Sequence, residues 1–140
     1  MFRKHITSRA MVPVMLCLQI LPLAIFPVDT YSIKTQEWWL PLLLALLTVI
    51  SLVQLIVRHS TALWPWYLMS FSQGFNIISR LMMLLPHSTQ SVDGGGLAAN
   101  GVYIAVAFAT MLFSAFEIWY GELPEVRRKF AARVVAKAEA

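Results

Sequence analysis

Three polar side chains, Gln73, Asn76 and Arg80, lie three and four residues apart within a long apolar segment. Helical residues at this spacing share one face, so the segment carries an intramembrane polar stripe if it spans a bilayer. Three roles are open to such a stripe. We expect first an interhelical polar clamp, the common role of polar residues in membrane helices. A contact with another subunit or a lipid headgroup is the second role, and a substrate, quinone or ion site is the third.

The partner of Arg80 decides between these roles. Side chains lean toward the N-terminus of their helix, so Arg80 is directed inward, toward Asn76, and needs a partner within the protein. An acid of an outer loop or a backbone carbonyl freed by a proline meets this need. The candidates are Asp29, Glu37, Asp93, Pro22 and Pro27. We also expect Gln19, near the middle of the first apolar segment, to lie at the depth of Gln73 and to hydrogen-bond with it.

No residue pattern in the sequence indicates catalysis or metal binding. The three histidines lie far apart, Cys17 is the single cysteine, and the glycine run 94–96 lacks the Lys-Ser/Thr of a P-loop. Glu117, the only acid within an apolar segment, lies near a segment end, where we expect it to pair with Arg9 or Arg58. We therefore expect no enzyme, no catalytic residue, no metal and no resident cofactor. Bound lipids are expected, and no residue supports a quinone or pigment.

Four apolar segments must position these side chains. Hydrophobic residues make up 59% of the 140 residues and charged residues only 13%, which is outside the range of soluble domains. A bilayer-spanning helix needs about 20 apolar residues. The expected spans cover residues 10–28, 38–57, 62–85 and 97–119. Short connections make sequential helices antiparallel neighbours. The sequence thus predicts an all-α integral membrane protein, with a four-helix antiparallel transmembrane bundle as the domain 1–121.

Basic residues predict the orientation of the bundle. Nine lysines and arginines lie before the first span, between the second and third, or after the fourth, whereas only Lys34 lies in the other two loops. The positive-inside rule then places both termini in the cytoplasm, in a multi-pass topology. All five tryptophans lie near expected span ends, as in an aromatic belt.

Residues 122–140 form a separate basic tail. Pro124 suits the first turn of a helix, and Val126, Phe130 and Val134 fall on one face of it. We expect an amphipathic helix on the cytoplasmic leaflet, drawn by anionic lipid headgroups. A docking site for a partner is the alternative. The expected contact residues are Arg127, Arg128, Lys129 and Arg133. Beside membrane spans these cations do not indicate nucleic acid binding.

Small residues on the fourth span suggest close packing. Gly101, Ala105 and Ala109 recur at every fourth position, which forms a ridge that lets a second helix approach. Together these features predict a non-catalytic subunit that packs within and stabilises a larger membrane complex, one that performs electron transfer, light harvesting or transport, with other integral membrane subunits as partners. The alternative is a small homo-oligomeric channel or transporter whose path is lined by the polar stripe. A membrane enzyme acting on lipids or quinones is the third hypothesis.

Overall fold

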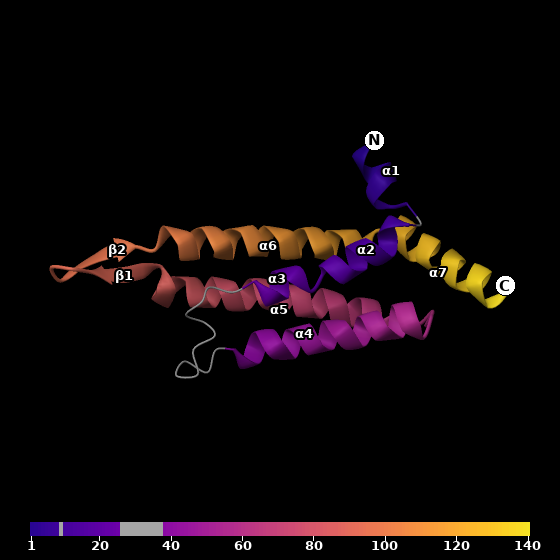
Figure 1. Ribbon diagram of the computed structural model, residues 1–140, viewed down its shortest axis with the longest axis horizontal. Coiled ribbons are helices and arrows are strands. Elements are labelled where there is room, and N and C mark those ends of the chain that lie inside the picture. The colour runs from indigo at the N-terminus through magenta and orange to yellow at the C-terminus, as the bar shows by residue number, and fades with distance from the viewer. Residues whose placement is uncertain (9, 26–37) are drawn as a thin grey trace.

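The computed structural model describes residues 1–8, 10–25 and 38–140, which are mostly helical. The helices before the centre of the chain are α1 (Phe2–Ile6), α2 (Met11–Leu18), α3 (Leu21–Ala24) and α4 (Trp39–Leu52), which continues as the π-helical turn η2 (Val53–Val57). The later helices are α5 (Trp64–His87), α6 (Gly101–Glu122) and α7 (Pro124–Ala138). The strands β1 (Thr89–Val92) and β2 (Gly96–Ala99) lie between α5 and α6. In Figure 1, α4, α5 and α6 run along the long axis, with the strands at one end and both termini toward the other.

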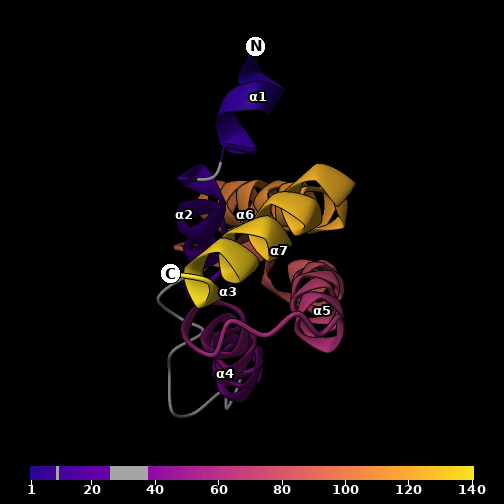
Figure 2. The ribbon, with the colours of Figure 1, turned by 90° about the vertical axis from the view of Figure 1, so that its right-hand side faces the viewer.

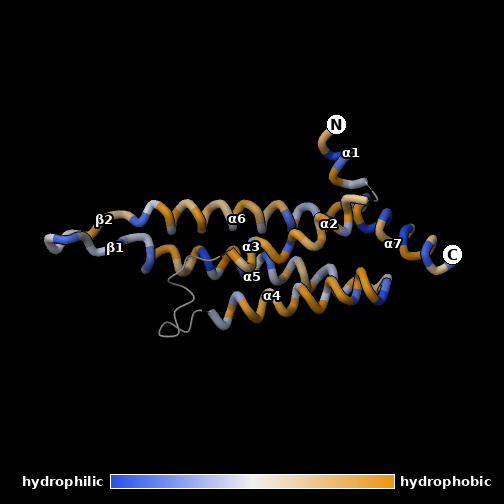
Figure 3. The backbone as a smooth tube through the Cα atoms, viewed as in Figure 1, coloured by the Kyte–Doolittle hydropathy of each residue, from blue (hydrophilic) through white to orange (hydrophobic). Residues whose placement is uncertain are grey.

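Two helices among the described residues are long and apolar enough to cross a membrane. The first, Trp39–Val57, covers nearly the whole of the second expected span, and the other is α6. Figure 3 shows the apolar character of α4 and α6 along most of their length. Only 33% of the apolar window of each helix is buried within the protein. Most of each apolar helix surface therefore faces outward.

The described part of the first expected span, 10–28, is not one continuous helix. The described part is 14 residues long, Met11–Ala24, and it breaks at Gln19 and Ile20 between α2 and α3. The cause is Pro22, which has no N–H for the Leu18 carbonyl and whose ring crowds the preceding turn. At about 1.5 Å per residue this segment reaches roughly 21 Å, which is less than the thickness of the hydrocarbon core. The rest of the expected span lies outside the described residues.

The third and fourth spans also differ from the prediction. Helix α5 has the length to span a bilayer, but its polar stripe and its serines lower its mean hydropathy. The chain is not purely α-helical, because β1 and β2 form an antiparallel hairpin, in which Thr89 pairs with Ala99 and Val92 with Gly96. Gly94 and Gly95 have φ of 111° and 81°, a turn conformation that glycine favours. Residues 97–99 are therefore strand, and α6 begins only after Asn100, whose Oδ1 accepts from the Tyr103 N–H and caps the helix.

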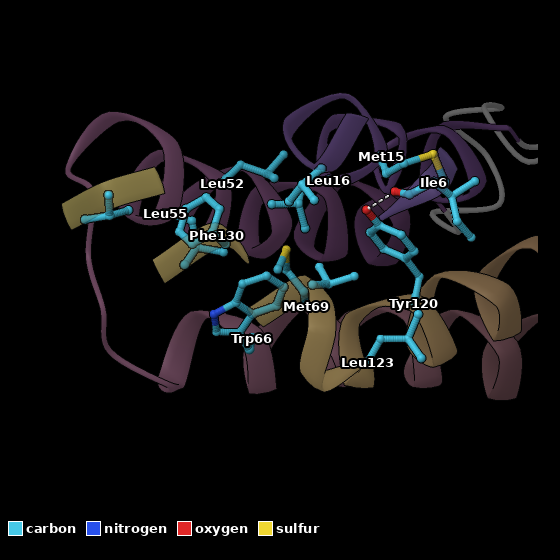
Figure 4. Close-up of a cluster of buried hydrophobic side chains, with 13 residues drawn as sticks. Ile6, Met15, Leu16, Leu52, Leu55, Trp66, Met69, Tyr120, Leu123 and Phe130 are labelled. Atoms are coloured by element: carbon cyan, nitrogen blue, oxygen red, sulfur yellow. Dashed lines mark hydrogen bonds between the residues drawn. The ribbon is translucent and has the colours of Figure 1, made fainter. Parts of the chain in front are cut away.

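Helix α7 forms as predicted, but its apolar face packs on protein. Val126, Phe130 and Val134 are buried and join a core with residues of α2, α5 and η2. Figure 4 shows Phe130 beside Trp66, and their rings meet edge to face with centroids 5.7 Å apart. Figure 2 shows α7 crossing the end of the bundle. The expected placement of this face on the lipid leaflet is wrong, because the end of the bundle offers an apolar surface of its own.

Candidate functional site

The polar stripe of α5 lies in the interior, where Arg80 binds the end of α3. Arg80 is 3% exposed. Its Nη2 donates to the Pro22 carbonyl at 2.7 Å and also to the carbonyl of Ile25. The last carbonyls of a helix have no partner within the helix, so the guanidinium caps the C-terminal end of α3. The partners are backbone carbonyls of the first segment, as one of the alternatives expected, but they are those of Pro22 itself and of Ile25 rather than the Leu18 carbonyl that Pro22 leaves free. Asp29, Glu37 and Pro27 lie outside the described residues.

Asn76 links three helices. Its Nδ2 donates to the Ser114 Oγ of α6 at 2.9 Å and to the Pro22 carbonyl at 3.3 Å. Its Oδ1 accepts from the Arg80 Nε at 3.2 Å, which agrees with the expected inward direction of Arg80. Each polar atom of the Asn76 side chain thus has a partner, and α3, α5 and α6 meet at this residue.

Gln73 completes the seam at the break between α2 and α3. Its Nε2 donates to the backbone carbonyl of Gln19 at 2.7 Å. Within a regular helix that carbonyl would accept from the N–H of Leu23, but the Leu23 N–H bonds to Ile20 instead. The expected contact between Gln19 and Gln73 is present, although it uses the main chain of Gln19. We call Gln19, Gln73, Asn76, Arg80 and Ser114 the polar seam.

The polar seam works as a clamp between helices. Gln19, Gln73, Asn76 and Ser114 are each at most 1% exposed. The donors of the stripe bind carbonyls that the proline break and the end of α3 leave free. Hydrogen bonds of this kind contribute about 0.6 kcal/mol each in membrane proteins, up to about 1.7. This arrangement can hold helices together, because Gln73, Asn76 and Arg80 each donate to a residue of another helix or of the break between α2 and α3.

Glu117 differs from its expected role. Its side chain is 1% exposed, and both carboxylate oxygens are buried without a hydrogen bond from the described residues. Arg58 is exposed and forms no ion pair with Glu117 in the part of the chain that the structure describes. Arg9 lies outside it. The sequence did carry a signal for this interior position, since Thr110, Ser114 and Glu117 are spaced four and three apart, as the stripe of α5 is.

The small-residue ridge of α6 faces outward. Gly101, Ala105 and Ala109 are all exposed, whereas the buried face of α6 carries Tyr103 and Ala107. The ridge therefore does not pack within the bundle. Large apolar side chains flank it on the outer surface of α6: Val102, Phe108 and Leu112.

The four basic residues expected to contact lipid have different surroundings. Arg127 pairs with Glu122 at 3.0 Å, donates to the Gly121 carbonyl and lies over the rings of Trp66 and Tyr67. Lys129 donates to the carbonyl of Thr7 at 2.7 Å. These two cations fasten α7 to the rest of the protein. Arg128 and Arg133 are exposed.

A small cavity that sequence reasoning did not predict lies at the end of the molecule where α7 packs. Its volume is about 70 Å³, and its lining includes His59, Arg133, Lys137, Pro13, Phe130 and Val134. Basic and apolar side chains thus line the cavity together, where α7 approaches α2 and the end of η2.

Among the described residues no group of three or more His, Cys, Asp or Glu side chains is placed to hold a metal ion. No protein-family model, curated protein sequence or solved structure matches this chain.

Proposed function

We propose that the chain is a non-catalytic, multi-pass membrane subunit whose helices form a four-helix transmembrane bundle within a larger complex. The observation that carries this proposal is the inverted polarity of the structure. Gln73, Asn76, Arg80 and Glu117 are buried, whereas large apolar side chains are exposed along α4, α5 and α6. The exposed residues include Leu42, Leu46, Phe71, Ile78, Phe108 and Leu112. Hydrocarbon is the solvent in which polar residues turn inward and such apolar faces are stable.

The clamp geometry favours a structural subunit over a channel. A channel would need the polar stripe to line a hydrated path, but the donors of Gln73, Asn76 and Arg80 bind backbone carbonyls, the Ser114 hydroxyl or one another. The outward ridge of α6 instead offers close approach to a helix of another subunit, since small residues let two backbones come together. Other integral membrane subunits are the proposed partners of this face.

Orientation and lipid contact are part of the same proposal. Both termini lie toward one end of the bundle (Figure 1), and the cavity lined by His59, Arg133 and Lys137 lies at that end. We assign this end to the cytoplasmic side by the positive-inside rule. Arg128, Arg133 and Lys137 are exposed there and suit the phosphates of anionic lipids, which attract basic residues by about 1 kcal/mol each.

The test uses matched substitutions on α6. Native complexes are extracted in mild detergent and separated by size, with wild type, Ala105→Leu on the ridge and Ala115→Leu, an exposed position off the ridge, compared side by side. We expect wild type and Ala115→Leu to migrate with a larger complex and Ala105→Leu to be released from it. Migration of all three as the same self-sized oligomers would support the channel instead. Recovery of the chain in the supernatant without detergent would refute the membrane proposal.

A further inference from the structure

Four buried side-chain oxygen atoms have no hydrogen-bond donor among the described residues. They are the side-chain oxygens of Gln19 and Gln73 and both carboxylate oxygens of Glu117. Each of these side chains is at most 1% exposed. Buried polar atoms nearly always have partners, and a buried charge without one is especially costly. Four unpartnered acceptors in one protein of this size therefore need an explanation.

The helix pairing brings these side chains to one level of the bundle. Helices α5 and α6 are antiparallel, and two hydrogen bonds set their register: Asn76 to Ser114 at 2.9 Å and Ser70 to Glu122 at 3.4 Å. Gln73 lies midway between Ser70 and Asn76, and Glu117 lies one helical turn from Ser114 toward Glu122, so this register places the two buried residues at the same level. Gln73 in turn contacts Gln19 through its Nε2.

Among the described residues, which do not include Arg9, the charged and titratable groups around this level have other partners. On α6, the Tyr120 hydroxyl donates to the Ile6 carbonyl at 2.8 Å. On α7, Arg127 pairs with Glu122 and Lys129 donates to Thr7. On α5, Arg80 donates to Asn76 and to carbonyls of the first segment. None of these hydrogen bonds and ion pairs involves the carboxyl of Glu117.

We propose that Gln19, Gln73 and Glu117 form a buried site for one positive charge, either a proton on the Glu117 carboxyl or a monovalent metal cation among the oxygens. These four oxygens are all acceptors, and oxygen acceptors are the ligands of hard cations. The other buried atom without a hydrogen-bond partner among the described residues, Arg127 Nη2, is a donor and lies 3.0 Å from Glu122 in an ion pair. One positive charge neutralises the single carboxylate. A proton taken from water makes one carboxyl oxygen a donor to a glutamine oxygen, with no change of oxidation state. This site goes beyond the structural role proposed above, because its occupant joins the broken first segment to α5 and α6.

The experiment compares full-length wild type, Glu117→Gln and Glu117→Asp in detergent, with Glu139→Gln as a control that removes an exposed acid. Infrared spectra in H₂O and D₂O report the carbonyl stretch of a protonated carboxylic acid. Thermal unfolding in sodium, potassium and choline chloride reports a bound metal cation. Glutamine supplies its own donor and mimics the protonated acid, so Glu117→Gln replaces the proton with a fixed hydrogen bond.

A proton site predicts a protonated-acid band in wild type and Glu139→Gln, its loss in Glu117→Gln and its displacement in Glu117→Asp. A metal site predicts that wild type and Glu139→Gln unfold at a higher temperature in sodium or potassium chloride than in choline chloride. Glu117→Gln is expected to lose this difference. Either result supports the proposal. The aspartate variant assigns the band even where the glutamine variant does not fold. A wild type with no protonated-acid band and no dependence on the cation would overturn the site and leave the membrane proposal standing.

Discussion

Replacement of Arg80 by methionine tests whether the polar seam clamps the helices. Methionine keeps much of the apolar stem of the side chain but removes its donors. Three hydrogen bonds are lost, those to Asn76, to Pro22 and to Ile25. At about 0.6 to 1.7 kcal/mol each, their sum is roughly 2–5 kcal/mol. Removal of a buried cation offsets part of this loss, since the charge no longer leaves water on folding. We therefore expect the free energy of unfolding to fall by about 2 kcal/mol.

The assay is reversible unfolding in mixed detergent micelles, followed by tryptophan fluorescence, with Arg58→Met as the control. Arg58 is exposed at the end of η2, so the same charge is removed outside the seam. The double variant Asn76→Leu/Arg80→Met is expected to lose less than the sum of the single variants, because both side chains bind each other and the Pro22 carbonyl. If Arg80→Met differs from Arg58→Met by less than about 0.5 kcal/mol, below the average for one such bond, the clamp reasoning is wrong.

Three further substitutions test other parts of the structure. Pro22→Ala is expected to destabilise the protein by roughly 1 kcal/mol, although alanine is the better helix former. The reason is that a regular helix would take the Gln19 carbonyl away from the Gln73 side chain. A gain in stability in the same unfolding assay would contradict this. Phe130→Ala removes a buried ring that packs on Trp66 and should cost about 3–5 kcal/mol, with α7 then cleaved by protease far faster than in wild type; unchanged cleavage would show that α7 is docked by other contacts. Tyr120→Phe removes one hydrogen bond to Ile6 and should cost about 1 kcal/mol, with faster amide hydrogen exchange confined to α1 and its junction with α2.

The sequence predicted the elements that depend on local pattern. The bounds of α4 with η2 and the helix at 122–140 follow from an apolar run and from the positions of Pro124, Val126 and Phe130. The stripe of α5 could be predicted because the spacing of Gln73, Asn76 and Arg80 alone places them on one face of a helix. The hairpin was missed because the residues that form its strands alternate weakly in polarity, and its turn depends on the positive φ of Gly94 and Gly95. The docking of α7 was missed because an amphipathic face suits a lipid surface and a protein surface equally well.

The interior position of Glu117 could not be derived from its distance to the segment end. That distance was counted along the chain, whereas burial depends on what covers the end of the helix. Here α7 crosses the end of the bundle (Figure 2), and its residues Val126 and Phe130 are buried. Helix α7 therefore covers the end of the bundle near which Glu117 lies. A residue near a helix end is shallow only where no other element packs over that end.

The proline break and the polar stripe make sense only together. In hydrocarbon, a broken helix leaves carbonyls that water cannot reach, and each one without a donor costs free energy. A stripe of amides and a guanidinium on a neighbouring helix has the opposite need, because its donors lack acceptors. Gln73 meets the carbonyl of Gln19 at the break, and Arg80 meets the carbonyls at the end of α3. Each feature alone would destabilise a membrane bundle. Because one supplies acceptors where the other supplies donors, their combination fixes the depth of the first segment against α5, which general apolar packing between helices does not.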